Sequence, residues 1–303
     1  MIYTLTLNPS VDYIVEADEI ELGKLNRSKK ETKLPGGKGI NVSRVLRSMG
    51  TESKAIGFLG GFTGNYVEEF LNKEGIFTGF VKIDGDTRIN VKLKAGSETE
   101  INASGPAVSN LALGLLKEQI KQLGTGDFLV IAGSIPSSMP ESIYEEIVQI
   151  CKKSGAEVIV DAEGNLLKSI IHYKPFLIKP NHHELGQLFD KEITSVEEAV
   201  TYGKKLVEAG AKNVIVSMAE KGAVYINETD AFIATVPSGK VKSSVGAGDS
   251  MVAGFLAQYI KSKDRQDAFR YSVASGSATA FSIGLCTPEK VEQLLPEVNI
   301  QKR

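Results

Sequence analysis

A glycine-rich turn that contains one carboxylate, Gly246-Ala-Gly-Asp249, precedes a segment with helical spacing. Apolar residues recur between residues 251 and 260 at three- and four-residue intervals, so we expect a helix that begins at Ser250, after a β-rich stretch that ends at Val245. Free backbone amides and the positive end of the helix dipole would then face the turn, where they can hold an anion such as a phosphate oxygen. Asp249 could cap the helix, or it could be a general base that takes a proton from an attacking hydroxyl.

A second glycine-rich turn, Pro35-Gly-Gly-Lys-Gly-Ile-Asn41, enters a helix that we predict from Gly39 to Met49. Glycines allow a ligand to approach the backbone closely, which suits a polar ligand with several hydroxyl groups. The turn has neither the G-x-x-x-x-G-K-[ST] spacing of a Walker loop nor the G-x-G-x-x-G pattern of dinucleotide-binding sheets. It therefore lends no support to either of those nucleotide sites.

Short apolar runs alternate with longer helical patterns in the middle and C-terminal parts of the chain, which predicts βαβ units and a mostly parallel sheet. The predicted strands are 128–132, 158–160, 176–178 and 214–216, and the predicted helices include 141–153 and a segment from the capping box Ser195-Val-Glu-Glu198 to Gly210. Polar residues follow the four strands, namely Gly133 and Ser134, Asp161, Lys179 to Asn181, and Ser217. Because the carboxyl ends of parallel strands meet at one edge of a sheet, these residues indicate a ligand site there.

The first hundred residues have a different pattern. Residues 11–22, 27–34 and 87–103 alternate polar and apolar side chains as strands do, with few helical stretches between them. We therefore expect one α/β domain over residues 1–303, with a small β layer formed by the separated segments of about 11–34 and 86–104. An exposed face on this layer would favour pairing with a second copy of the chain.

Composition narrows the class of protein. The 303 residues are 42% hydrophobic and 24% charged, which is typical of a soluble globular protein. The formal net charge of −2 provides no basic field for nucleic acid or anionic lipid. The two cysteines, Cys151 and Cys286, fit a pair of reduced thiols in a cytoplasmic protein, and no segment has the pattern of a signal peptide or a membrane span.

Six segments together resemble the ribokinase-like sugar kinases of the phosphofructokinase B family, and they occur in the family's order along nearly the whole chain. They are Thr6-Leu-Asn-Pro-Ser-Val-Asp12, Gly36-Gly-Lys-Gly-Ile-Asn-Val42, Gly133-Ser-Ile-Pro136, Lys179-Pro-Asn-His-His-Glu184, Val216-Ser-Met-Ala-Glu-Lys-Gly222 and Ser244-Val-Gly-Ala-Gly-Asp-Ser250. The resemblance implies a three-layer α/β/α domain with a mostly parallel central sheet and a small β-sheet lid. In the phosphosugar branch of the family, the lids of two chains often clasp to form a homodimer.

The resemblance also implies a division of labour among the site residues. Asp249 matches the catalytic base, and the backbone amides of Gly246, Ala247 and Gly248 match the anion hole. The positions that match sugar-binding residues are Asp12, Gly37, Lys38 and Asn41. Lys24 and Arg88, on the proposed lid, match basic residues that meet the substrate's phosphate, although a lone lysine or arginine is usually a solvated surface charge.

On the nucleotide side, the resemblance implies ATP as a substrate with bound Mg²⁺. The matching positions are Lys179 and Asn181 for the phosphates, Ser217 and Gly222 for the nucleotide loop, and Ser275 and Gly276 near adenine. Asn181 and Glu184 match the Mg²⁺ element, where Glu184 would act through water because magnesium retains several waters. Glu184 could equally only complement the helix dipole. His182 and His183 lack further ligands at zinc spacing.

The expected function is ATP-dependent phosphorylation of a phosphorylated ketohexose. The segment Thr87-Arg-Ile-Asn-Val-Lys-Leu93 and the Gly-Lys-Gly turn resemble the branch that phosphorylates fructose 1-phosphate at the C6 hydroxyl. Fructose 6-phosphate and tagatose 6-phosphate remain alternative substrates. Two other classes also remain open, a non-catalytic sensor of sugar phosphates or nucleotides and a nucleotide-dependent oxidoreductase.

Overall fold

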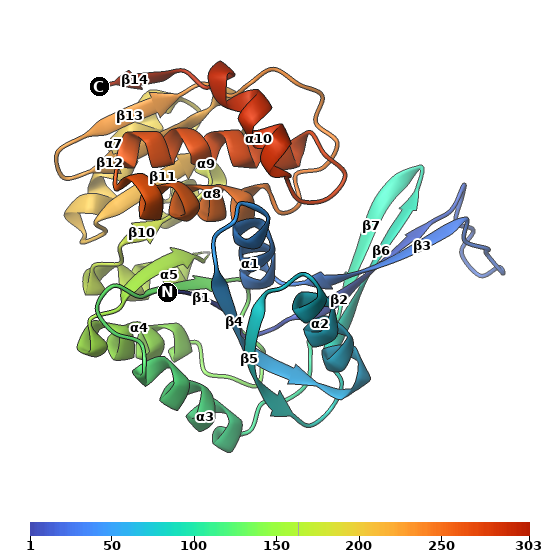
Figure 1. Ribbon diagram of the computed structural model, residues 1–303. Helices are drawn as coiled ribbons and strands as arrows, with labels where there is room; N and C mark the ends of the chain where they lie inside the picture. Colours follow the sequence, from blue (N-terminus) through green and yellow to red (C-terminus); the bar gives the residue numbers. More distant parts are fainter. Residues whose placement is uncertain (163) are drawn as a thin grey trace.

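The computed structural model describes residues 1–162 and 164–303 and contains two β-sheets of different character (Figure 1). Within the described residues, the central sheet has ten strands in the order β14-β13-β12-β11-β10-β9-β8-β1-β4-β5. These strands are β1 (Ile2–Thr6), β4 (Ser53–Gly60), β5 (Phe77–Ile83), β8 (Phe128–Ala132), β9 (Glu157–Asp161), β10 (Leu177–Ile178), β11 (Asn213–Ser217), β12 (Ala223–Asn227), β13 (Ala231–Ala234) and β14 (Ile300–Lys302). The neighbouring strands from β5 to β11 in this order pair in parallel. Beyond β11, strands β12, β13 and β14 extend the sheet with antiparallel pairing.

The central sheet is covered on both faces, which explains why its inner strands read as continuous apolar runs. Successive residues of β8 point to opposite faces: Leu129 and Ile131 belong to one buried cluster, while Val130 belongs to the other. The same alternation places Ile159 of β9 opposite Val158. Both hydrophobic layers are therefore built from the same strands, and the sheet is fixed from two sides.

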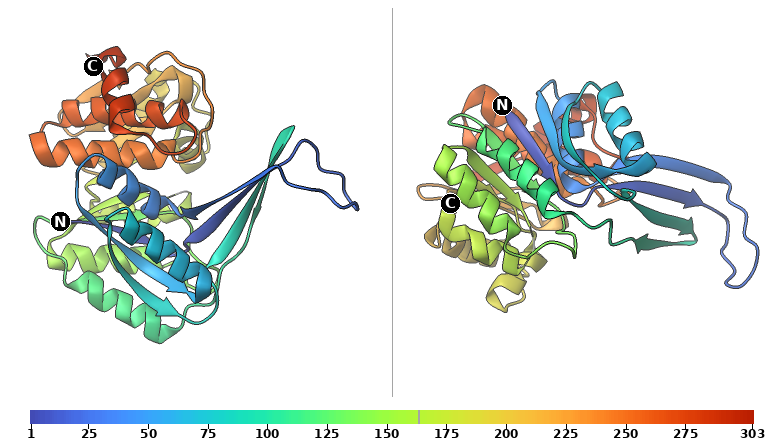
Figure 2. Two further views of the ribbon diagram at one scale, coloured as in Figure 1. Left: turned by 45° about the vertical axis from the view of Figure 1, so that its right-hand side comes forward. Right: turned by 90° about the horizontal axis from the view of Figure 1, so that it is seen from below.

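Helices form the outer two layers (Figures 1 and 2). One face carries α1 (Lys38–Ser48), α2 (Gly61–Lys73), α8 (Ala247–Ser262), α9 (Arg265–Ala280) and α10 (Pro288–Leu294). The other face carries α3 (Asn110–Lys121), α4 (Ile143–Ser154), α5 (Asn165–Ile170), α6 (His182–Phe189) and α7 (Val196–Glu208). Short 3₁₀ turns follow at 171–173, 219–221 and 295–297.

The second sheet has four strands in the order β3-β2-β6-β7, and it projects from the body of the molecule (Figure 2). Its strands are β2 (Ser10–Glu16), β3 (Lys30–Gly36), β6 (Arg88–Ala95) and β7 (Ser97–Asn102). Only β2 and β6 pair in parallel; the other two pairs are antiparallel. Because side chains alternate across a strand, one face presents Asp12, Asn90 and Lys92 and the opposite face presents Tyr13, Val91 and Leu93.

The expected fold class is confirmed, with a large mostly parallel sheet between two helical layers and a small separate sheet. The Ser195 capping box is also present, because Ser195 and Glu198 each accept from the other's backbone amide. One local prediction is wrong. Helix α8 begins at Ala247 and not at Ser250, and the residues that lead to Val245 are not a strand.

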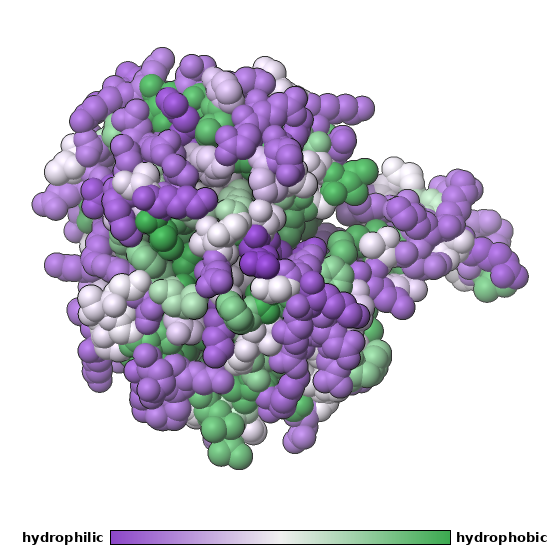
Figure 3. All heavy atoms as spheres, in the orientation of Figure 1, coloured by the Kyte–Doolittle hydropathy of each residue, from purple (hydrophilic) through white to green (hydrophobic). Residues whose placement is uncertain are grey.

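The surface of the face seen in Figure 3 is mainly hydrophilic, including most of the projecting sheet. Among the described residues, none of the helices combines the length and the apolar character needed to cross a membrane.

Candidate active site

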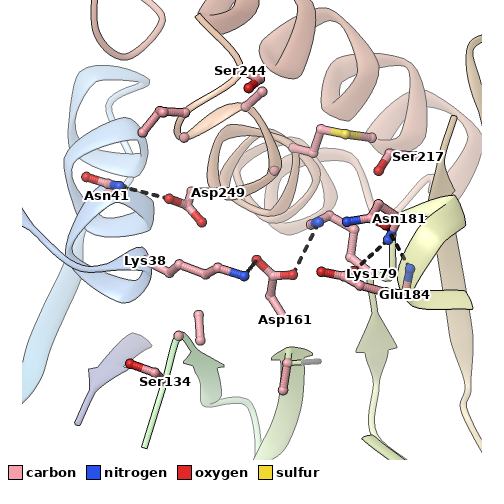
Figure 4. Close-up of a pocket in the computed structure, with 18 of the residues that line it drawn as sticks. Lys38, Asn41, Ser134, Asp161, Lys179, Asn181, Glu184, Ser217, Ser244 and Asp249 are labelled. Atoms are coloured by element: carbon pink, nitrogen blue, oxygen red, sulfur yellow. Dashed lines mark hydrogen bonds and ion pairs between the residues drawn. The ribbon is translucent and has the colours of Figure 1, made fainter. Parts of the chain in front are cut away.

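A cleft of about 1910 Å³ lies between the carboxyl ends of the central parallel strands and the polar face of the second sheet. It is lined by residues that follow β8, β9, β10 and β11, by the start of α1, by the start of α8 and by residues of β2, β6 and β7. The polar residues that follow successive strands in the sequence therefore do meet at one edge. Figure 4 shows the centre of this cleft.

The glycine turn that the sequence predicts as an anion site lies at the start of α8. Gly246 is the N-cap residue, with φ 78°, and a Cβ on it would lie 2.7 Å from Cδ2 of Leu285. A side chain at this position would therefore meet both backbone strain and a steric clash. The amide of Ala247 donates to the carbonyl oxygen of Ser244 at 3.2 Å, whereas the amides of Gly246 and Gly248 have no partner among the described residues. Two of the three amides that were expected to hold an anion, those of Gly246 and Gly248, are therefore free to donate to it.

Asp249 lies in the first turn of α8, and its carboxylate does not cap the helix. Its Oδ2 accepts a hydrogen bond of 2.8 Å from Nδ2 of Asn41, at the start of α1 (Figure 4). The residue is 5% exposed. Burial, together with the negative charge of Asp161, raises the pKa of Asp249 to about 6, although the Asn41 hydrogen bond opposes that shift. Asp249 therefore does not cap the helix. With a pKa of about 6, its carboxyl group can exchange a proton near neutral pH.

Asp161, at the end of β9, is the buried anion that organises the middle of the cleft. Its carboxylate lies 3.2 Å from the Lys179 ammonium and 3.7 Å from the Lys38 ammonium (Figure 4). Burial alone would raise the pKa of Asp161, but the two ammonium groups outweigh burial and hold this pKa below its usual range. The side chains of Asp161 and Lys179 are only 4% and 5% exposed. Sequence reasoning noticed Asp161 as a polar residue after a strand but gave it no role.

Asn181 and Glu184 form a capping box at the start of α6. Oδ1 of Asn181 accepts from the Glu184 amide at 2.9 Å, and Oε2 of Glu184 accepts from the Asn181 amide at 2.7 Å. Burial raises the pKa of Glu184 above its usual value, while its bond to the Asn181 amide opposes the shift. Oε1 of Glu184 makes no hydrogen bond within the described part of the chain, so one oxygen faces the cleft without a partner. An oxygen donor of this kind fits a hydrated magnesium ion.

The second sheet forms one polar wall of the cleft. Oδ1 of Asp12 accepts from Oγ of Ser10 at 2.8 Å and from Nδ2 of Asn90 at 3.1 Å, so the carboxylate is fixed in orientation. A Cβ on Gly36 would lie 2.4 Å from the same oxygen, which explains why the opposite strand carries glycine there. Gly37, with φ 121°, leads from this strand into α1 and lines the cleft.

Arg88 also lines the cleft, but its guanidinium is already engaged. Nη1 donates to the carbonyl oxygen of Ala103 and Nη2 to that of Asn8, both at 2.9 Å, and the buried Nε has no partner among the described residues. Burial lowers the pKa of Arg88, with the charge of Asp12 acting in the opposite direction. In this structure, Arg88 ties together the two chain segments that enter and leave the second sheet.

The structure brings most of the predicted site residues to the cleft and leaves two of them outside it. Those that line the cleft are Asp12, Gly37, Lys38, Asn41, Arg88, Lys179, Asn181, Glu184, Ser217, Gly222, Gly246, Ala247, Gly248, Asp249 and Gly276. Lys24 lies in the turn between β2 and β3, where it is exposed and paired with Glu21. Ser275 is fully buried and donates to the Tyr271 carbonyl oxygen; its Oγ faces Gly254 of α8, where a Cβ would lie 2.2 Å away. Ser275 packs α8 against α9 and does not line the cleft.

Sequence reasoning missed the apolar end of the cleft. Val236, Val273, Ala280 and Phe281 line it, from the loop after β13 and from α9 and its C-terminal end. An apolar slot beside polar walls suits a flat, partly apolar ring such as a nucleobase. No sequence pattern identifies these residues, because they lie on elements that are far apart in the chain and come together only in the folded protein.

The chain belongs to the pfkB family of carbohydrate kinases, whose family match covers residues 5–292. It is therefore a phosphotransferase that acts on a sugar hydroxyl, and the oxidoreductase alternative is not supported. The 1-phosphofructokinase of Bacillus subtilis is 56% identical over 302 residues, covering all of both chains. The tagatose-6-phosphate kinase of Staphylococcus epidermidis is more distant, at 33% identity over 307 residues and 99% of each chain. The solved structure of phosphofructokinase-2 from Escherichia coli with substrates and products has a TM-score of 0.91 and 30% identity over 98% of each chain.

The buried pair of Asp161 and Lys179 yields a stability prediction. Asp161→Asn should lower the free energy of unfolding by about 3–5 kcal/mol, because it leaves a buried ammonium without its counter-ion. Urea unfolding would measure the change. The matched control is Glu118→Gln, which breaks the exposed pair with Lys121 and should cost less than about 0.5 kcal/mol. Equal losses in the two variants would contradict the prediction.

Proposed function

We propose that this protein transfers the γ-phosphoryl group of ATP to the C6 hydroxyl of fructose 1-phosphate, giving fructose 1,6-bisphosphate and ADP. The observation that carries the proposal is Asp249, a buried carboxylate with a pKa of about 6, held by Asn41 beside two free amides of a helix N-terminus. The 56% identity with a 1-phosphofructokinase over the full chain supports the choice of substrate.

In the proposed mechanism, Asp249 acts as the general base. Its ionised carboxylate accepts the proton of the C6 hydroxyl as that oxygen forms a bond to the γ-phosphorus. The bond between the γ-phosphorus and the bridging oxygen breaks, and ADP leaves with the electron pair. A pKa of about 6 suits this role, because the group is mainly ionised at neutral pH and yet basic enough to take the proton.

The free amides at the start of α8 stabilise the charge on the transferring group. Gly246 and Gly248 supply N–H groups that are not used within the described chain, and the positive end of the helix dipole adds to them. The amide of Ala247 serves the turn instead, through its bond to Ser244. The anion hole that we propose is therefore smaller than the three consecutive amides expected from the sequence.

The nucleotide occupies the opposite side of the cleft in our proposal. Lys179 meets the phosphates, Ser217 and Gly222 border the nucleotide loop, and the base lies in the apolar slot that Val273 and Phe281 help to line. Asn181 and Glu184 are the residues that would hold Mg²⁺, with the unbonded Oε1 of Glu184 as the oxygen that faces it. When bound, the ion neutralises charge on the phosphate oxygens.

The second sheet serves as the lid. It carries Asp12 and Asn90 on the face that borders the cleft, so its closure would place those groups on the sugar and exclude water from the γ-phosphoryl group. Exclusion of water matters because a base that activates a hydroxyl could equally activate water.

Removal of the proposed base tests the mechanism. Asp249→Asn should lower kcat by about a thousandfold or more while fructose 1-phosphate still binds, because only proton transfer is lost. In the wild-type enzyme, kcat/KM should fall about tenfold for each pH unit below about 6, where the carboxylate becomes protonated. Steady-state kinetics across pH would measure both effects. The control Asp190→Asn, at an exposed helix end, should leave kcat unchanged; a loss of tenfold or less in Asp249→Asn would rule out the base.

A substrate comparison tests the choice of sugar. We expect kcat/KM for fructose 1-phosphate to exceed that for fructose 6-phosphate and tagatose 6-phosphate, because the chain is more similar to a 1-phosphofructokinase than to a tagatose-6-phosphate kinase. A coupled assay of ADP release would measure all three. A tenfold advantage for either 6-phosphate would overturn the proposal, and no ADP release with any of the three would favour the non-catalytic sensor.

We also propose that two copies pair through the outer face of the second sheet. That face carries Ile89 and Ile101, which are 41% and 59% exposed, beside the partly buried Val91 and Leu93. An exposed apolar sheet face is costly in water unless a partner covers it. Sedimentation at micromolar concentration should give twice the chain mass, and Ile101→Lys should give the monomer. Leu111→Lys, on the exposed side of α3, is the matched control and should remain dimeric; a monomeric wild-type protein would refute the pairing.

A further inference from the structure

Lys92 of β6 is a buried cation that has two ion pairs but no hydrogen bond among the described residues. The residue is 9% exposed and lines the cleft on the polar face of the second sheet. Its ammonium lies 3.3 Å from Oε1 of Glu100 and 3.9 Å from Oδ2 of Asp12, and it makes no hydrogen bond within the described part of the chain. A lysine that is buried to this extent normally has its N–H groups satisfied. Its open donors therefore point to a ligand.

The other lysines and arginines that line the described cleft are already committed. Lys38 and Lys179 both form ion pairs with the buried Asp161. The two Nη groups of Arg88 are bonded to backbone carbonyl oxygens. Lys92 is thus the cation on the sugar side that can accept a new anionic partner without breaking a hydrogen bond.

The position of Lys92 fits the far end of a phosphosugar. In fructose 1-phosphate, the acceptor hydroxyl on C6 and the phosphate on C1 lie at opposite ends of the molecule. With the C6 hydroxyl at Asp249, the other end is directed toward the second sheet. Along that sheet, Asn90 lies beside Asp12 in the strand register, and Lys92 is the next residue of β6 on the same face.

The charges around Lys92 favour an exchange of partners. Asp12 and Glu100 place two carboxylates near the single ammonium of Lys92, so these three side chains together have a formal charge of −1 before any ligand binds. Glu100 lies on β7, the edge strand, and its side chain is 38% exposed. The Glu100 side chain can therefore rotate out into the solvent when a phosphate dianion takes its place beside Lys92. The Lys92 ammonium would pair more strongly with the phosphate oxygens than with the Glu100 carboxylate at 3.3 Å.

We infer that Lys92 contacts the phosphate that the substrate already carries, exchanging Glu100 for it, and so determines specificity for phosphorylated over neutral sugars. This inference rests on the proposed function and names the residue that recognises the phosphosugar.

Kinetics with matched variants test the role of Lys92. Lys92→Met should raise KM for fructose 1-phosphate by about tenfold or more and leave kcat within about threefold, because a binding contact is lost and the base is untouched. Lys92→Arg should recover most of the affinity. Lys94→Met is the control: Lys94 lies on the same strand and face, opposite Glu98, but its side chain is 43% exposed. The KM of the Lys94→Met variant for fructose 1-phosphate should stay within about twofold of the wild-type value.

Three results would overturn the inference. One is an unchanged KM in Lys92→Met, and another is an equal loss of kcat/KM for fructose and fructose 1-phosphate, which would mean that Lys92 only orients Asp12. The third is a rise in KM in Glu100→Gln, since removing the competing carboxylate should lower KM. If Lys92→Met does not fold, as judged by its thermal midpoint, Lys92→Gln takes its place. If the wild-type enzyme prefers a different phosphosugar, the proposed function fails, and the same variants are then measured with that sugar.

Discussion

Charge compensation in a buried space governs the whole cleft. Asp161 has two ammonium groups beside it and stays ionised. Burial and the negative charge of Asp161 raise the pKa of Asp249 to about 6, against the opposing effects of its Asn41 hydrogen bond and of the same two lysines. The two carboxylates thus take opposite roles from their surroundings alone. Asp161 is the counter-ion of Lys38 and Lys179, and the carboxyl of Asp249, with a pKa of about 6, can exchange a proton near neutral pH. Lysines closer to Asp249 would lower its pKa further and make it a weaker base.

This arrangement depends on the topology of the sheet. Asp161 and Lys179 follow neighbouring parallel strands, so their side chains emerge at the same edge without any loop having to carry them there. Asp249 and Asn41 are separated by 208 residues in the chain and meet because α1 and α8 cover the same face of the sheet. Strands and helices fix position more precisely than loops do, which explains why the groups that must hold a proton come from them.

Much of this could be predicted from the sequence, for identifiable reasons. The run 128–132 matches β8 residue for residue, because a strand covered on both faces is continuously apolar. Most of the site residues that were predicted from glycine turns and strand ends line the cleft. The helix start at Ala247 was missed because apolar periodicity detects only the buried part of a helix and its first turn here is Ala, Gly and Asp. Lys24 and Ser275 do not line the cleft. The sequence could not show this, because no local pattern separates a lysine of a connecting loop from one of the cleft, or a serine that packs helices from one that borders a ligand.

The two hydrogen bonds that Arg88 donates to the carbonyl oxygens of Asn8 and Ala103 affect how the second sheet tolerates insertions and deletions. The Arg88 side chain joins the segment that enters β2 to the segment that leaves β7 and so holds the sheet at its base. Residues 17–29, between β2 and β3, and the tight turn at Gly96 lie at the distal end, far from that fastening in the chain. Insertions and deletions in these tips would alter the reach of the sheet without disturbing the proton chemistry. The reach of the sheet, and with it the surface that it offers to a partner, can therefore change while the cleft keeps its residues.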